Sequence, residues 1–122
     1  WHVRAWCEKN LAYRDFVLSR FRGEAELMDT SQHSAADDAQ WQRIVQLEIV
    51  PDPRLSAAQR EVVASDYGMT DGRLGLRTRA TLVEYLLRLL QLDPYSTDDN
   101  PLAQQIVLAN RDELDEFLFA AR

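Results

Sequence analysis

Arginine supplies most of the positive charge of this chain, and the basic residues gather near its start. Of the 14 basic residues, 13 are arginine. Residues 1–22 hold five basic and two acidic side chains, a net charge of +3, so the total of −6 leaves −9 on the remainder. Because the planar guanidinium binds phosphate or carboxylate through two hydrogen bonds, this stretch can form a local anion site on an acidic protein.

Few residues have the types and spacing that catalysis or metal binding requires. Cys7 is the only cysteine, and the pattern puts no basic partner beside it, so we expect a core residue rather than a nucleophile. His33 with Asp37 and Asp38 offers one histidine in a polar stretch, which favours a solvated loop over a metal site. We therefore expect no enzyme, no metal and no cofactor.

The size and composition are those of an ordinary globular chain. With 122 residues, 46% hydrophobic and 28% charged, it is long enough for one domain, or for a small domain with a piece of a second. The longest apolar stretch, residues 82–92, is shorter than the roughly 20 residues that cross a bilayer. No signal peptide is visible, so we expect a soluble cytoplasmic protein.

The basic residues near the start lie in a predicted β-hairpin. Residues 1–7 alternate, with Val3, Ala5 and Cys7 on one face and His2, Arg4 and Trp6 on the other. Residues 8–10 form a turn, and a second alternating strand runs to Phe21. An isolated hairpin is marginal in water, so it needs further strands.

A polar stretch, residues 29–40, is predicted to be a linker, and a second unit begins near Trp41. Its elements alternate between strand and helix. We expect strands over residues 43–50, 73–80 and 104–109, and helices over residues 56–67, 81–92 and 110–121. The fold class is therefore α+β, with a hairpin followed by a small α/β unit.

Local signals mark where the three predicted helices begin and end. Ser56 with Gln59, and Thr81 with Glu84, have the spacing of capping boxes. Gly68 is expected to stop the first helix and Asp93-Pro94 the second, while Asn110 with Glu113 begins the third. Helix 81–92 is apolar nearly all round, so we expect it in the core, at a subunit contact, or both.

Three arginines share one face of the strand over residues 73–80: Arg73, Arg77 and Arg79. The simpler explanation is cross-strand pairing with Gln46 and Glu48. The alternative is that they extend a groove for nucleic acid.

The string Trp1-His2-Val3-Arg4-Ala5-Trp6-Cys7, followed by Tyr13 and by residues 14–20, resembles the WYL family of bacterial transcription regulators. In that family a small Sm-like β-barrel carries a Trp-Tyr-Leu motif, and an Arg-x-Phe type segment follows on the next strand. Here the motif reads Trp1-His2-Val3, which keeps the strand pattern but has no tyrosine hydroxyl.

The rest of the chain resembles the C-terminal extension found after WYL barrels in phage-defence repressors of the CapW and BrxR kind. The segments that carry this resemblance are residues 51–56, 66–69, 83–87 and 106–111. Such regulators consist of an N-terminal winged helix-turn-helix, a barrel and this extension, and they act as dimers. The resemblance implies that residues 1–28 are the last strands of a barrel, that residues 29–40 are a linker, and that residues 41–122 form the dimerisation domain.

The same resemblance implies a ligand site on the barrel, where basic side chains bind a nucleotide or single-stranded nucleic acid. By position the candidates are His2, Arg4, Arg14, Ser19 and Arg20. Arginines on adjacent strands can converge on phosphate, and a nearby ring can stack on a base. The alternative is that Arg14 and Asp15 are a surface pair and Arg20 a solvated edge residue.

Two functions remain as hypotheses. The first is the ligand-sensing and dimerisation portion of a transcriptional repressor, which forms a homodimer and reaches operator DNA only through a winged helix-turn-helix outside this chain. The second is a purely structural dimerisation module without a ligand of its own. No membrane partner is expected in either case.

Overall fold

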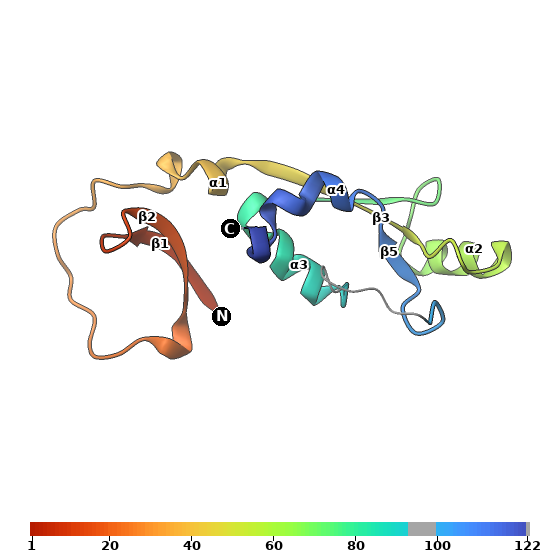
Figure 1. Cartoon of the computed structure of the whole chain (residues 1–122), viewed down its shortest axis with the longest axis horizontal. Coiled ribbons are helices and arrows are strands. Elements are labelled where there is room, and N and C mark those ends of the chain that lie inside the picture. Colours follow the sequence, from red (N-terminus) through yellow and green to blue (C-terminus); the bar gives the residue numbers. More distant parts are fainter. Residues whose placement is uncertain (93–99, 122) are drawn as a thin grey trace. The chain divides into compact units, whose positions relative to one another are not determined.

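The computed structural model describes residues 1–92 and 100–121, and the chain divides into two compact units, Trp1–Gln42 and Arg43–Arg122 (Figure 1). The first contains strands β1 (His2–Cys7) and β2 (Ala12–Val17), two 3-10 turns and the short helix α1 (Ala39–Gln42). The described residues of the second unit form three strands, three α-helices and three 3-10 turns. The mixed α+β class predicted from the sequence is confirmed.

The hairpin is confirmed, with antiparallel pairing that sets Arg4 opposite Asp15 and Trp6 opposite Tyr13. The prediction that its second strand continues to Phe21 was wrong. β2 ends at Val17, and Leu18–Arg20 form a 3-10 turn. The Leu18 N–H still donates to the Trp1 carbonyl, but the Phe21 N–H donates back to the Leu18 carbonyl, so cross-strand pairing stops there.

The end of the polar stretch is more ordered than the sequence suggested. Ala35–Asp37 form a 3-10 turn, and α1 follows at once. Ser34 and Asp37 have the arrangement of a capping box: the Ser34 N–H and hydroxyl both donate to Asp37 Oδ2, and the Asp37 N–H donates to the Ser34 carbonyl. We expected a linker here because the stretch lacks apolar periodicity. That criterion does not detect polar side chains that cap a turn.

The second unit is built on an antiparallel sheet of order β4-β3-β5. β3 (Ile44–Pro51) is the central strand, between β4 (Leu74–Arg79) and β5 (Ile106–Leu108). Helix α2 (Ala57–Asp66) begins at the predicted Ser56–Gln59 capping box, and Gly68 follows it with a φ of +64°. That left-handed conformation favours glycine, so the predicted stop is confirmed.

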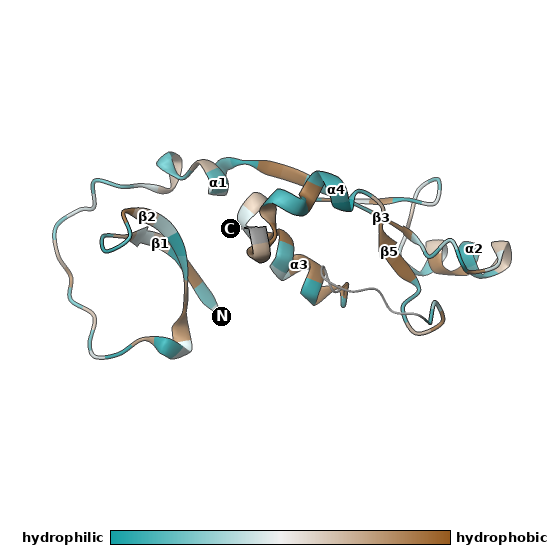
Figure 2. Cartoon of the chain, in the orientation of Figure 1, coloured by the Kyte–Doolittle hydropathy of each residue, from teal (hydrophilic) through white to brown (hydrophobic). Residues whose placement is uncertain are grey.

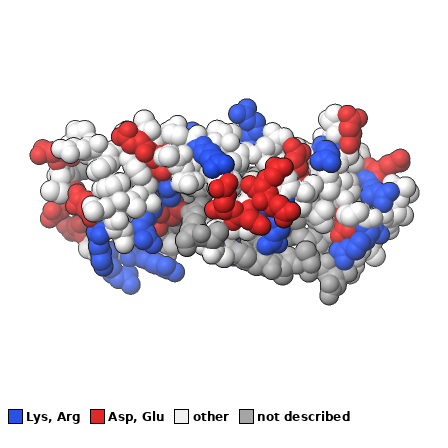
Figure 3. Space-filling model, turned by 45° about the horizontal axis from the view of Figure 1, so that its top comes forward, with Lys and Arg blue, Asp and Glu red and all other residues white. Residues whose placement is uncertain are grey.

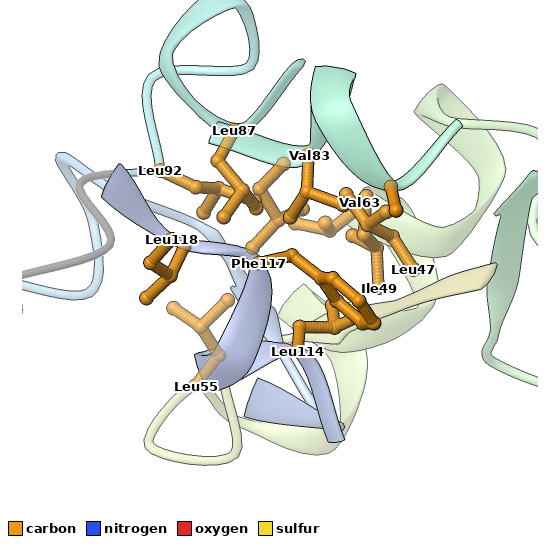
Figure 4. Packing of buried hydrophobic residues seen from close by; sticks show 12 residues of the cluster. Leu47, Ile49, Leu55, Val63, Val83, Leu87, Leu92, Leu114, Phe117 and Leu118 are labelled. Carbon is orange, nitrogen blue, oxygen red and sulfur yellow. The ribbon is translucent and has the colours of Figure 1, made fainter. Parts of the chain in front are cut away.

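One face of this sheet is buried. Leu47 and Ile49 of β3 are fully buried, and Figure 2 shows β5 and much of β3 as hydrophobic. Helix α3 (Val83–Leu89) contributes Val83 and Leu87 to the same cluster. Figure 4 shows Leu114, Phe117 and Leu118 from the C-terminal segment closing it. Every member of this core lies in the second unit.

The predicted capping box at Thr81 and Glu84 was wrong. Ala80–Leu82 form a 3-10 turn before α3, and Thr81 provides no cap: its hydroxyl is buried without a hydrogen-bond partner in the described residues. Glu84 is fully buried, and its carboxylate accepts hydrogen bonds from Arg88 and from the Phe119 N–H. It is therefore used to fasten the C-terminal segment. The expected stop at Asp93-Pro94 lies outside the described residues.

The last helix is interrupted. It was expected to run over residues 110–121, but α4 (Arg111–Leu114) gives way to 3-10 turns at Asp115–Phe117 and Phe119–Ala121. The interruption allows two consecutive residues, Phe117 and Leu118, to be buried together. A continuous helix over this short segment would not necessarily bury both. In the described part of the chain, no helix is long and apolar enough to span a membrane.

Asn110 was expected to cap the last helix, but its side chain makes no capping hydrogen bond to α4. It extends the pairing of β3 beyond the end of β5 instead. The Glu48 N–H donates to Asn110 Oδ1 at 2.9 Å, and Asn110 Nδ2 donates to the Gln46 carbonyl at 2.8 Å. The amide thus replaces the backbone of a longer β5. It satisfies two strand groups that would otherwise lack partners there.

We expect Asn110→Ala to lower the free energy of unfolding by about 1–3 kcal/mol, because it leaves the Glu48 N–H and the Gln46 carbonyl unpaired. Urea unfolding measures this change. Asp112→Asn, at an exposed position in the same segment, is the control and should stay within about 0.5 kcal/mol of wild type. Equal stability of the two variants would show that the amide does not support β3.

Candidate functional site

The structure separates the five candidate ligand residues. The hairpin register puts His2 and Arg4 on the face that also carries Trp6, Tyr13 and Asp15. Arg14 lies opposite Ala5 and therefore belongs to the other face, where it is exposed. Ser19 and Arg20 are exposed in the 3-10 turn after β2. Only His2 and Arg4 share one face.

Arg4 is held by two carboxylates. Its Nε and Nη2 atoms donate to the two oxygens of Asp38, at 2.7 and 3.1 Å, and Nη1 donates to Asp15 at 3.3 Å. The side chain of Asp38 is 4% exposed and that of Arg4 13%. Breaking such a pair leaves a charge buried without a counterion, so the arrangement fixes Asp38 against the hairpin.

The pair shifts the pKa of both partners. Burial alone would raise the pKa of the Asp38 carboxyl, but hydrogen bonds from Arg4 and from the backbone of Trp41, with the charge of Arg4, bring it below its usual value. The hydrogen bond to Asp38 raises the pKa of Arg4 against the effect of burial. Both groups are therefore charged at neutral pH.

Aromatic side chains strengthen the same attachment. The rings of Trp6 and His33 stack with centroids 3.7 Å apart and an interplanar angle of 11°, and Tyr13 meets Trp6 edge-on at 5.2 Å. The Tyr13 hydroxyl donates to the Ser34 carbonyl at 2.7 Å. Residues 33–38, which we name the clasp segment, are thus fastened to the hairpin at three points. The expectation of a solvated loop was wrong for Asp38, which is buried, whereas His33 and Asp37 are exposed.

A cavity of about 430 Å³ lies between the hairpin and the clasp segment. Its walls are mostly apolar, and the residues that matter for binding are Arg4, Trp6, Tyr13, His33, Asp38 and Trp41. Four rings and one buried ion pair therefore line a single space. Of these residues, sequence reasoning proposed only Arg4 as a ligand residue; His33, Asp38 and Trp41 reach the hairpin only when the polar stretch folds back.

The other residues considered from the sequence do less. Arg77 lies opposite Gln46, but Arg79 faces Ile44 and Gly75 faces Glu48, so the expected pairing with Glu48 is not the register observed. Figure 3 shows acidic and basic side chains sharing one face of the molecule.

The Cys7 thiol is partly exposed and donates to Asn10, which contradicts a core position. Among the described residues, no group of three or more His, Cys, Asp or Glu could hold a metal ion.

We expect acid to release the clasp segment. A carboxyl whose folded pKa is depressed stabilises the structure above its unfolded pKa and loses that contribution as the pH falls through the folded value. The protection factors of the amides of residues 34–42, which are exchange rates corrected for the intrinsic effect of pH, should therefore be high above about pH 4 and fall below it. Asp38→Asn should abolish this pH dependence; protection factors that fall equally in both proteins would contradict it.

Comparison with known proteins assigns the second unit. Residues 44–114 match the family model described as "BrxR transcriptional regulator, C-terminal dimerization domain". The match begins at the first residue of β3 and ends at the last residue of α4. It therefore covers the three-stranded sheet and most of the elements that pack on it.

Full-length relatives match both units. A protein of Stenotrophomonas maltophilia named "DNA-binding transcriptional repressor CapW" is 35% identical over 97% of this chain and 40% of its own length. Proteins of the same name from Escherichia coli and Pseudomonas aeruginosa are 38% and 35% identical over 93% and 97% of this chain. The chain spans about two fifths of these relatives. It belongs to the family of BrxR transcriptional regulators and carries their C-terminal dimerization domain.

Proposed function

We propose that this chain is the ligand-sensing and dimerisation portion of a DNA-binding transcriptional repressor that acts in the cytoplasm. The observation that carries the proposal is the match of the second unit to a dimerization domain, with a further unit attached to it. The relatives are named DNA-binding repressors and are much longer. We propose that operator DNA is bound by a winged helix-turn-helix outside this chain, and that two copies join through residues 43–122.

The hairpin fits the proposal if it is the end of a larger Sm-like barrel. Among the described residues it contributes nothing to the hydrophobic core. Several apolar side chains on it or just after it stay exposed: Val3, Val17, Leu18 and Phe21. Two strands rarely hold a stable sheet alone. Further strands packed on these side chains would remove that apolar surface from water.

Sensing would use the basic side chains of the hairpin. Arg14, Ser19 and Arg20 are exposed, so a phosphate of a nucleotide or a single strand can reach them. Arg4, next to His2, is engaged by Asp38 and Asp15, so an anion must compete for it. A ligand that prefers one arrangement of the subunits shifts the population toward it, and so changes the spacing of the DNA-binding domains.

We predict that Arg14→Ala or Arg20→Ala weakens binding of a short single-stranded DNA to the chain, and that the remaining affinity depends less steeply on salt, because each phosphate contact releases counterions. Fluorescence anisotropy at several salt concentrations measures both. In the full-length repressor, the same variants should lose the response to ligand while the dimer persists. Binding and response equal to wild type would refute this use of the arginines.

A purely structural dimerisation module remains the second candidate. The observation that favours it is that the carboxylates of Asp38 and Asp15 already bind Arg4. It predicts a dimer that shows no salt-dependent binding of DNA or nucleotides at all.

A further inference from the structure

We propose that the cavity beneath the clasp segment binds a flat aromatic anion, and that the clasp segment itself is the built-in competitor for this site. The inference rests on the proposed sensing role of the hairpin and specifies where and how the ligand is taken up. It depends on residues that the comparison with relatives does not assign, above all Trp6, His33 and Asp38.

The clasp segment presents the two groups that such a ligand would present. His33 lays a flat ring on Trp6 with nearly parallel planes, as a heteroaromatic base would. Five residues later, the Asp38 carboxylate receives two parallel hydrogen bonds from Arg4, as a phosphate or carboxylate would. One segment of the chain thus fills a ring position and an anion position at once.

The cavity beside these groups has room for the exchange. Its volume, about 430 Å³, lies within the range of small-molecule sites, and Tyr13 and Trp41 add two more rings to its wall. Arg4 supplies a largely buried positive charge on the cavity wall, and Asp38 and Asp15 neutralise it until a ligand replaces them. A ligand with both a ring and an anionic group can take over both contacts, whereas one with a single group cannot.

The two contacts of the clasp segment are unequal in strength. His33 is an exposed residue that stacks on one side of Trp6, so its ring can leave without opening a core. Asp38 is nearly fully buried and also accepts from the Trp41 N–H at the start of α1. The ring position should therefore exchange first, and the anion position should hold the segment until the ligand replaces the carboxylate.

Displacement would be transmitted through the chain itself. The clasp segment continues through α1 to Gln42, and Arg43 is the residue before β3. β3 is the central strand of the unit that matches the dimerization domain. Release of the clasp segment therefore lengthens the unfastened chain between the hairpin and β3.

The test is isothermal titration of the 122-residue chain with adenosine monophosphate, with adenosine and inorganic phosphate titrated separately. We expect the nucleotide to bind more tightly than either fragment. His33→Ala should tighten binding roughly twofold to tenfold, the contribution of one aromatic pair that no longer competes. Asp38→Asn should also tighten binding, because it weakens the competitor for Arg4. Trp6→Ala should abolish it.

Gln32→Ala, an exposed neighbour of His33, is the matched control and should leave the affinity unchanged. A gain of affinity in His33→Ala cannot result from misfolding, so the proposal stays testable even if Trp6→Ala fails to fold. Affinity unchanged or reduced in both His33→Ala and Asp38→Asn would overturn it. If salt-dependent DNA binding through Arg14 and Arg20 persists in that case, the inference fails and the proposed function stands.

Discussion

The ion pair between Arg4 and Asp38 is the contact on which the first unit depends. That unit contributes no residue to the hydrophobic core found in the described chain, so polar and aromatic contacts must hold it together. The pair joins a strand to a segment 34 residues later, and both side chains are largely withdrawn from water. A buried pair of this kind adds little net stability, but separating it is costly. It therefore specifies where the clasp segment lies.

The second unit follows the opposite principle. Its core is apolar, and polar groups serve mainly to fasten the ends of elements, as Asn110 does for β3 and Glu84 for the C-terminal segment. A unit with its own core does not need a ligand to define its structure, which suits a permanent role in joining subunits. A unit fastened by a few exchangeable contacts can respond to a ligand. The two structural principles thus correspond to the two proposed roles, dimerisation and sensing.

The sequence predicted what is encoded locally. Alternation predicted β1 and β3, and Ser56, Gln59 and Gly68 marked both ends of α2, because these signals act within a few residues. It failed where a side chain is used at long range. Thr81, Glu84 and Asn110 have capping spacing, yet two of them serve distant backbone groups. His33 and Asp38 were considered only as a weak metal site, and their contacts with the hairpin were missed because their partners are 27 and 34 positions away along the chain. Of the candidate site, sequence reasoning therefore reached Arg4 but not the cavity.

Dimerisation by residues 43–122 is the central claim, because the proposed sensing acts by changing how two subunits are arranged. Sedimentation equilibrium of the 122-residue chain tests it most directly. The account predicts a mass of about 28 kDa, twice the 14.1 kDa of one chain, that is retained on dilution through the range of protein concentrations measured. A mass of 14.1 kDa at every concentration would contradict it.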